Sequence, residues 1–576
     1  MKRLIVLPIF IVVFILALPL SVKGLDETKP LYSFTNPLEV ITYYNSEEAV
    51  VIPNQGKKYK HYFRAAYIFT DENEDFPLLS SNVTNRMEVI DEFANDYQNL
   101  LDVLAESHIN VLIFQVRPLL DAFYPSEYNP WSQYLMGTEG EFIEGWDPLA
   151  FMIEEAHLRG IEFHAYLNAF KVSNLTTAEQ TKQMILSTLS PNNFARKHPD
   201  YVLIGKDLKL YLNPAEEAVM DYFLDTVEEL VRKYDVDAIH LDSEIYPSGG
   251  FVGDLDFVQP FKESRSEYQT PEAFRQAKLN TLLQKIDLTI DQLNFQLNRS
   301  VQFGVRYHSV DGLIDLERLF YHVDYVIPEV TERFEGNESG GYADLLREGV
   351  KIYENASYQQ FTPPNLYIGI NALFDSADYE RELKSYLLYN QRYDSIQGVA
   401  FYHLPDLTEH KTQYETFKTI TKDLYASIRF LPPALKTYNP DIEPPNFDLK
   451  RVGGTVKINW RRKDSAKYYV LYRVESKDTS ILREELLQPE NILQIFKNDP
   501  NKSVFTYTDT TTKDGKNYKY ALTVIDRANR ETTLPIILDF NPSIQTNQTP
   551  VIILFVVTSV IAFFAVVVSS YLVLRD

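Results

Sequence analysis

The chain has 576 residues, of which 45% are hydrophobic and 13% aromatic, so we expect two or more well-packed domains and exclude a disordered protein. Its net charge of -24 and pI near 4.9 repel polyphosphate, which argues against nucleic acid as a partner and favours a neutral or weakly charged ligand. The lack of cysteine excludes disulfides, thiolate metal sites, cysteine nucleophiles and an N-terminal lipoprotein anchor.

The first 24 residues predict a secretory signal peptide. Two basic residues, Lys2 and Arg3, precede an apolar run over residues 4–20, and small residues follow up to Gly24. An uncleaved membrane anchor is the alternative, because the apolar run is long for a signal peptide. Residues 25–59 are expected to form an N-terminal extension.

Residues 60–430 predict an α/β fold, a (β/α)8 TIM barrel with enlarged loops, because eight β-rich runs alternate with amphipathic helical stretches. A doubly wound open sheet is the alternative, but no glycine-rich phosphate turn follows the first run. The predicted strands are 61–69, 110–118, 162–170, 237–246, 301–309, 324–330, 366–373 and 398–404. Helices are expected at 87–107, 148–159, 215–234, 270–298 and 380–393.

Polar residues stand at alternate positions of the second and third predicted strands. Arg117 ends the second strand on the face of Gln115, where it could bind a sugar hydroxyl; a structural ion pair is the alternative. In the third strand His164, Tyr166 and Asn168 share one face. Aromatic faces combined with imidazole and amide groups favour a sugar-binding site over a core histidine.

The fourth predicted strand ends in carboxylates and an aromatic residue. His240 and Asp242 share a face with Ala238, while Glu244 and Tyr246 lie just beyond. Buried His and Asp are costly unless they are paired or used, so a hydrogen-bonded core pair is the alternative to catalysis.

The sixth predicted strand adds Glu329, which with Asp242 would supply the pair of carboxylates that glycoside hydrolysis requires. We predict no metal site, because neither His-Glu-x-x-His nor His-x-His occurs, and no serine triad, because a nucleophile-elbow sequence is lacking.

The C-terminal part predicts a second domain and a membrane anchor. A proline-rich linker over residues 431–446 precedes four runs that alternate at period two, so residues 447–545 predict a β-sandwich, of fibronectin type III variety from Trp460 and Tyr518. Few contacts are expected across such a linker. The uncharged apolar run at 551–574 is long enough for a transmembrane helix, with an extracellular ectodomain before it.

The barrel segment resembles the glycosyl hydrolase-like 10 family in several long motifs that follow one another in the family's order. The motifs are Phe114-Gln-Val-Arg-Pro-Leu-Leu-Asp-Ala-Phe-Tyr-Pro-Ser126, Asn129-Pro-Trp-Ser132, Gly145-Trp-Asp-Pro-Leu-Ala150 with Glu154-Glu-Ala-His157, Ile161-Glu-Phe-His-Ala-Tyr-Leu-Asn168, Leu212-Asn-Pro214 and the strand at 237–247. The resemblance implies a TIM barrel, export and endo-acting cleavage of bacterial glycans, with peptidoglycan-type amino-sugar strands as a known substrate of some members.

The chain departs from the family at the predicted mouth of the barrel. Ser243 follows Asp242 where the family has a second acid, Glu244 replaces an aromatic residue, Arg306 opens a segment that is usually Ser-Pro-Phe, and Glu329 replaces a Gln. These differences leave two hypotheses open, a divergent glycoside hydrolase and a non-catalytic protein that binds glycan or organises the envelope.

For the enzyme hypothesis, Asp242, Glu329 and Glu244 are the candidate catalytic residues. The candidate substrate-binding residues are Arg117, His164, Tyr166, Asn168, His240, Tyr246 and Arg306. The expected partners are a glycan strand and, through the C-terminal helix, the membrane; we expect a monomer without a cofactor, localised to the cell membrane.

Overall fold

The computed structural model describes residues 28–540 apart from 78–85, 243–244, 248, 259–267, 269, 309–314, 337–339, 358–361, 405–409, 427–429, 435–441, 453, 477–482, 514–515 and 533–534. The predicted signal peptide, the predicted transmembrane segment and Glu244 therefore lie outside the described residues. Within those residues, the helices are all too short or too polar to cross a membrane.

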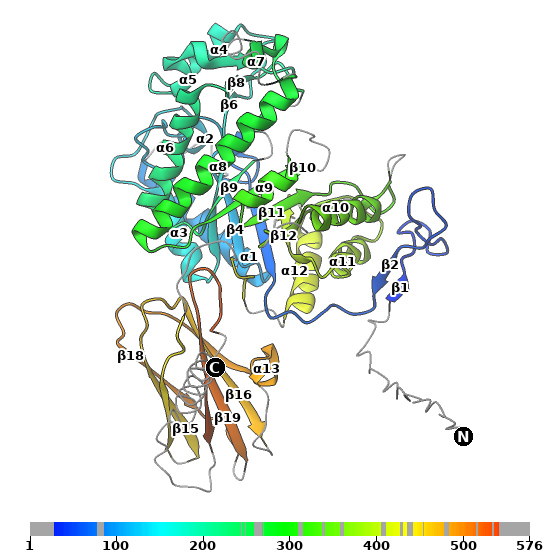
Figure 1. Ribbon diagram of the computed structural model, residues 1–576, viewed down its shortest axis with the longest axis vertical. Coiled ribbons are helices and arrows are strands. Elements are labelled where there is room, and N and C mark those ends of the chain that lie inside the picture. Colours follow the sequence, from blue (N-terminus) through cyan, green and yellow to red (C-terminus); the bar gives the residue numbers. More distant parts are fainter. Residues whose placement is uncertain are drawn as a thin grey trace, which may run out of the picture.

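Eight parallel strands close into a barrel, which confirms the predicted fold of this segment (Figure 1). Each barrel strand pairs with the next one along the chain, and β13 closes the barrel on β3. The strands are β3 (Phe63–Ile68), β4 (Val111–Arg117), β5 (Glu162–Leu167), β9 (Ala238–Leu241), β10 (Gln302–His308), β11 (Tyr325–Glu329), β12 (Asn365–Asn371) and β13 (Ile396–Tyr402).

Helices surround the barrel, and all five predicted helices are present. These are α1 (Arg86–Glu106), α3 (Pro148–Leu158), α6 (Glu217–Lys233), α8 (Pro271–Leu297) and α11 (Tyr379–Asn390), joined by α9 (Leu316–His322), α10 (Tyr342–Ser357) and α12 (Lys411–Tyr425). Local sequence fixes their starts: Asp147 caps α3 by accepting a hydrogen bond from the Ala150 amide, and Pro148 occupies the first helical position.

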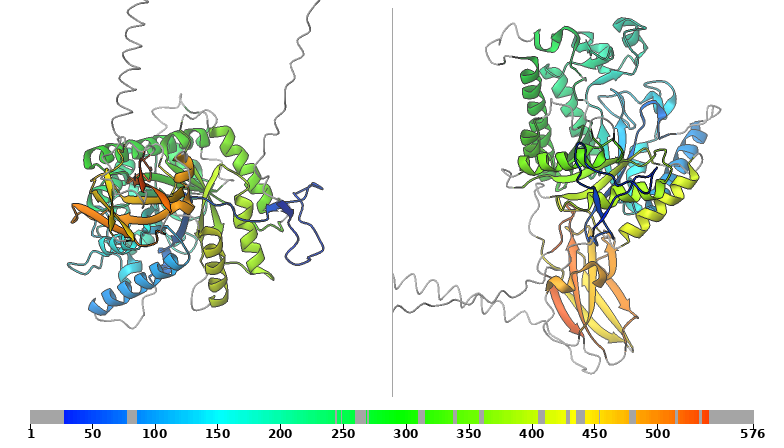
Figure 2. Two further views of the ribbon diagram at one scale, coloured as in Figure 1. Left: turned by 90° about the horizontal axis from the view of Figure 1, so that it is seen from below. Right: turned by 90° about the vertical axis from the view of Figure 1, so that its right-hand side faces the viewer.

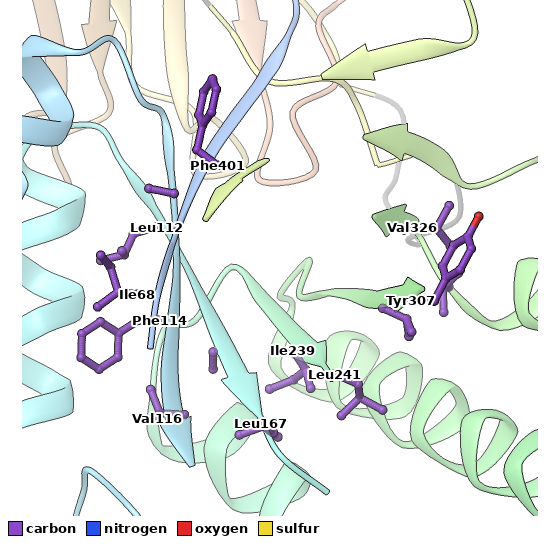
Figure 3. Packing of buried hydrophobic residues seen from close by; sticks show 14 of the residues in the cluster. Ile68, Leu112, Phe114, Val116, Leu167, Ile239, Leu241, Tyr307, Val326 and Phe401 are labelled. Atoms are coloured by element: carbon purple, nitrogen blue, oxygen red, sulfur yellow. The ribbon is translucent and has the colours of Figure 1, made fainter. Parts of the chain in front are cut away.

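Strand alternation separates two apolar layers. Side chains such as Phe114 and Leu241 point outward and pack beneath the helices (Figure 3). The inward positions carry aromatic residues, including Phe63, Tyr67 and Tyr325, which fill the barrel interior. Gly304 leaves room for them, because a Cβ at this position would lie 2.0 Å from the Tyr325 ring. The interior is thus a packed aromatic core with a few polar atoms among the rings.

A cap that the sequence did not predict covers the end of the barrel where the strands finish (Figure 1). It contains the three-stranded sheet β6 (Lys171–Ser173), β8 (Leu210–Leu212) and β7 (Val202–Ile204), with α4 (Lys182–Thr188), α5 (Phe194–Lys197) and α7 (Leu255–Val258). Arg275 of α8 anchors the cap, since its buried guanidinium makes two bonds of 2.7 Å to Asp256 of α7. The short helix α2 (Gln133–Met136) precedes α3.

The C-terminal domain is a β-sandwich at the opposite end of the barrel (Figures 1 and 2). Trp460 lies in its core between the two sheets and stacks on Phe505. One sheet contains β14 (Phe447–Val452), β15 (Thr455–Arg461) and β18 (Val504–Asp509); the other contains β17 (Ile492–Lys497), β16 (Tyr468–Ser476), β19 (Asn517–Ile525) and β20 (Ile536–Phe540), with the short α13 (Arg483–Leu486). The two-sheet architecture is as predicted; the fibronectin type III variety stays a prediction.

The expectation of few contacts across the proline-rich linker is not met. The Lys467 ammonium group bonds to Glu162 at the start of β5 and lies 3.7 Å from Asp237, just before β9. Asn529 donates to the same Glu162 carboxylate at 2.9 Å, and Arg527 pairs with Asp235 at 2.9 Å. Polar side chains of the β-sandwich therefore bind the end of the barrel where the strands begin.

The N-terminal extension packs on the outside of the barrel. Its strands β1 (Thr28–Pro30) and β2 (Val51–Pro53) pair with each other. The Tyr43 hydroxyl contacts the Tyr389 hydroxyl of α11 at 2.9 Å, and the Arg347 guanidinium of α10 lies 3.6 Å from the centre of the Tyr43 ring. The extension thus packs directly against α10 and α11, although these helices are about 300 residues further along the chain.

Candidate active site

Three charged residues meet where β9, β10 and β11 end. Arg306 of β10 bonds through one nitrogen to Asp242 at 3.0 Å and through another to Glu329 at 3.1 Å. A single guanidinium bridges both carboxylates, which keeps their oxygens within about 9.5 Å, the upper limit for paired carboxylates of glycosidases. The barrel therefore brings together two of the three predicted catalytic residues and one predicted binding residue. We call this group the ion triad.

The order of the barrel strands explains the ion triad. β10 lies between β9 and β11, and its register places His308 beside Glu329. Arg306, one inward position earlier, therefore reaches both neighbouring strands. Glu329 in turn lies against Gly369 of β12, where a Cβ would come within 3.1 Å of the glutamate side chain.

Aromatic rings surround the ion triad. The Tyr166 hydroxyl donates to Asp242 at 2.7 Å, and the Arg306 guanidinium lies 5.5 to 5.7 Å from the centres of the Tyr67, Phe69 and Tyr166 rings. Burial opposes the charge of Arg306, yet Tyr166 and the two carboxylates raise the pKa of Arg306 well above its ordinary value. The site thus combines a permanent cation, carboxylates and flat apolar faces, which suits a polyhydroxylated ligand.

Two polar groups at the mouth have no hydrogen-bond acceptor among the described residues. They are the Arg306 Nε–H and the hydroxyl of Tyr402, at the end of β13. Burial, followed by the charge of Glu329, raises the pKa of Tyr402, so this hydroxyl is a neutral donor at physiological pH. A buried donor without a partner is costly, and a ligand hydroxyl or carbonyl would satisfy it.

Both predicted histidines lie deeper in the barrel than the ion triad. The His240 ring forms hydrogen bonds with the Tyr67 hydroxyl through Nε2 (2.9 Å) and with the Tyr325 hydroxyl through Nδ1 (3.1 Å). His164 Nδ1 contacts the same Tyr325 hydroxyl at 2.8 Å. Burial, followed by His164 and Arg306, lowers the pKa of His240 well below its ordinary value. Both histidines therefore lie beneath the site as hydrogen-bonding groups, and His240 is a neutral one.

The other predicted binding residues make contacts within the protein. The pairing of β4 with β5 shifts its register between Gln115 and Arg117, and the Arg117 guanidinium bonds to the Asn168 and Ala169 carbonyls and to Tyr222 of α6. These contacts favour a structural role for Arg117, through hydrogen bonds to neutral groups and not through the ion pair that was the alternative. The Asn168 side chain accepts from the Lys171 amide at 3.0 Å.

Tyr246 is buried beside Phe251 in the cap, and its hydroxyl has no partner among the described residues. A binding role for Tyr246, Asn168 or Arg117 remains a prediction, since none of them has a described contact with the ion triad.

Sequence reasoning missed several residues of the site. Tyr67, Phe69 and Tyr402 line the mouth, and Tyr325 lies in the barrel interior between His164 and His240. Part of their signal was present, because Tyr67 and Phe69 share a strand face with Phe63, and Tyr402 shares one with Gly398 and Ala400. Among the described residues, no group of three or more His, Asp or Glu side chains is arranged to hold a metal ion.

A closed parallel barrel with carboxylates and aromatic rings at the ends of its strands has the architecture of the glycoside hydrolase barrels. Residues 63–340 match the model of the family described as Glycosyl hydrolase-like 10, which supports the resemblance seen in the motifs.

The chain is also similar to two proteins that are named as glycosyl hydrolases. The chain is 28% identical over 512 residues to the glycosyl hydrolase YngK of Bacillus subtilis strain 168, covering 81% of this chain and 91% of that protein. It is 31% identical over 248 residues to the glycosyl hydrolase DigH of Escherichia coli K12, covering 42% of this chain and 54% of that protein.

Among solved structures, α-L-fucosidase isoenzyme 2 of Paenibacillus thiaminolyticus superposes with a TM-score of 0.40 at 15% identity, covering 64% of this chain and 50% of that chain. The present chain thus spans about half the length of DigH and of the fucosidase.

Proposed function

We propose that the protein is a glycoside hydrolase of the glycosyl hydrolase-like 10 family that cleaves a glycan of the bacterial cell envelope, with peptidoglycan-type amino-sugar strands as the first substrate to test. The observation that carries the proposal is the ion triad, in which Asp242 and Glu329 stand at the ends of barrel strands and within reach of one guanidinium. The aromatic rings around it suit the C–H faces of sugar rings.

Asp242 is the carboxylate that faces the anomeric centre in this mechanism. It accepts hydrogen bonds from Tyr166 and Arg306, and both donors stabilise its charged form. A charged, fixed carboxylate can act as nucleophile or stabilise the oxocarbenium-like transition state.

Glu329 or Glu244 supplies the proton to the leaving oxygen. Glu329 needs to leave Arg306 before it can carry a proton, and a sugar hydroxyl that accepts from Arg306 would compete for that bond. Substrate binding and the release of Glu329 are therefore one event in this mechanism.

A non-catalytic glycan-binding protein is the second candidate, and one observation favours it. Arg306 engages both carboxylates in this structure, and a carboxylate held by a guanidinium is a poor proton donor. Binding through Tyr402, Arg306 and the aromatic rings does not require that the ion pairs open.

The experiment that separates the two candidates is incubation of the full chain with purified peptidoglycan glycan strands, with and without attached peptides. We expect new reducing ends and shorter saccharides by mass spectrometry. Binding to the strands without any new reducing end would refute the hydrolase and favour the binding protein.

Replacing Tyr402 with Phe should weaken the binding of an amino-sugar oligosaccharide by about threefold to tenfold, the value of one hydrogen bond. The free energy of unfolding should change by less than about 0.5 kcal/mol, because the hydroxyl has no partner among the described residues. Titration calorimetry measures the affinity. Tyr425→Phe is the control, because its buried hydroxyl also lacks a described partner but belongs to α12. Equal affinity of Tyr402→Phe and wild type would remove Tyr402 from the site.

The membrane location is proposed on the sequence of residues 1–24 and 551–574 alone. The ectodomain would face the cell envelope as a monomer, with the β-sandwich, which we propose to be of fibronectin type III variety, between the barrel and the membrane. Recovery of the full chain in the aqueous phase of a detergent separation would contradict the anchor.

A further inference from the structure

An unbroken chain of hydrogen bonds passes through the interior of the barrel. Tyr67 contacts His240 at 2.9 Å, His240 contacts Tyr325 at 3.1 Å, Tyr325 contacts His164 at 2.8 Å, and His164 contacts Glu162 at 3.3 Å. All five side chains are buried, with at most 4% of each residue exposed. We call these five residues the interior chain.

The direction of these bonds follows if Glu162 is ionised and each histidine carries one ring hydrogen. Ionised Glu162 only accepts, so His164 donates to it from Nε2. Lys467 already supplies a positive charge beside Glu162, and a His164 ring that carries only the Nε2 hydrogen accepts from Tyr325 at Nδ1. The Tyr325 hydroxyl then uses its hydrogen in the bond to His164, so its oxygen accepts from Nδ1–H of His240.

The Nε2 atom of His240 is left as an acceptor for the Tyr67 hydroxyl. Every proton of the interior chain therefore points away from the ion triad and toward Glu162.

The β-sandwich holds the lower end of the interior chain. Lys467 and Asn529 both bond to Glu162 Oε1, and the side chain of Lys467 is only 18% exposed. Burial alone would raise the pKa of Glu162, but the charge of Lys467 holds this pKa below its ordinary value. A cavity of about 200 Å³ lies here, lined by both domains, and is large enough for several water molecules.

The upper end of the interior chain lies under the ion triad. The Arg306 guanidinium is 5.7 Å from the centre of the Tyr67 ring, and Tyr67 packs edge-on against Tyr166, which bonds to Asp242. A neutral His240 beneath this group places no second positive charge under Arg306.

We propose that Lys467 of the β-sandwich is a positioning residue for the mouth of the barrel. By keeping Glu162 ionised, Lys467 fixes the direction of the hydrogen bonds in the interior chain. This direction keeps a neutral His240 beneath Arg306. The β-sandwich is then part of the working barrel and not a spacer. The effect on turnover rests on the proposed hydrolase activity; the direction of the chain does not.

If the charge of Lys467 is removed, we expect the hydrogen bonds of the interior chain to reverse their direction. A buried Glu162 that keeps Asn529 but has lost its cation would favour uptake of a proton, either on its own carboxyl group or on His164. In both cases His164 Nδ1 becomes a donor to Tyr325, Tyr325 donates to His240 Nδ1, and His240 donates from Nε2 to Tyr67. The Tyr67 proton then has to turn away from His240, toward the site.

Nitrogen-15 NMR of histidine-labelled full chain tests this directly, because the chain has only 10 histidines and long-range spectra report which ring nitrogen carries hydrogen. In the wild type we expect hydrogen on Nε2 of His164 and on Nδ1 of His240. Lys467→Met should move the His240 hydrogen to Nε2, and Lys467→Arg should retain the wild-type pattern.

Lys497→Met is the matched control, because Lys497 bonds to the His157 carbonyl in the same interface, 2.8 Å away, and has no described bond to Glu162. It should leave both tautomers unchanged. If glycan strands are hydrolysed, kcat should fall about threefold to thirtyfold in Lys467→Met and recover in Lys467→Arg.

Hydrogen on Nε2 of His240 in the wild type, which can be read even if a variant does not fold, would overturn the proposal; so would an unchanged His240 in folded Lys467→Met. A wild type that hydrolyses no glycan but shows the expected tautomers refutes the proposed function and keeps the interior chain.

Discussion

Asp242→Asn is expected to lower the turnover of glycan strands by at least about a hundredfold, the lower range for the loss of acid–base assistance, while affinity is largely kept. The carboxamide preserves the shape of the side chain, and its single oxygen can still accept from Arg306, while its amide nitrogen can donate to the Tyr166 oxygen. What it lacks is the negative charge that faces the anomeric centre. Reducing-end assays give the turnover, and calorimetry with an oligosaccharide gives the affinity.

Glu329→Gln is the companion variant, because it removes the other carboxylate of the ion triad without removing its shape. If Glu329 is the proton donor, its loss should be less severe on a substrate with an activated leaving group, whereas Asp242→Asn should be equally inactive on both. Asp242→Asn with wild-type turnover would exclude Asp242 as the catalytic carboxylate.

Arg306→Met is expected to reduce the free energy of unfolding by about 3 to 5 kcal/mol at pH 7, the cost of leaving buried charges without their partner. Asp242 and Glu329 would face each other without a cation, with side chains only 10% and 4% exposed. Denaturant unfolding, followed by the fluorescence of the barrel, measures the change.

Two variants make this result specific. Arg306→Lys keeps a charge but cannot bridge two carboxylates with one planar fork, so its loss should be smaller. Adding Asp242→Asn to Arg306→Met should restore part of the stability, because one of the unpaired anions is gone. A loss under about 1 kcal/mol for Arg306→Met would mean that the triad behaves like a surface ion pair.

The fold of the barrel could be predicted because its signal is local. Alternation along each strand and the helical period between strands identified all eight strands and five of the surrounding helices. The same alternation correctly placed His240 with Asp242 and His164 with Tyr166 on the inside. The cap was missed because its strands have only three residues each, too few for a period to show.

The site could be predicted only in part, because its contacts depend on which strands are neighbours. Arg306 was recognised as a departure from the family, but its bridge between Asp242 and Glu329 follows from the position of β10 between β9 and β11. The register shift in β4 that turns Arg117 toward α6 leaves no mark in the residue pattern. Lys467 and Glu162 are 305 residues apart, and the residues around each of them do not indicate that the two side chains form an ion pair.

The central claim is that the ion triad is the glycan-binding and cleavage site, and a structure of Asp242→Asn with a bound amino-sugar oligosaccharide tests it most directly. We expect an anomeric carbon about 3 to 3.5 Å from the residue 242 carboxamide, sugar hydroxyls on Arg306 Nε and Tyr402, and Glu329 released from Arg306. An oligosaccharide bound elsewhere, with Arg306 still bridging residue 242 and Glu329, would contradict it.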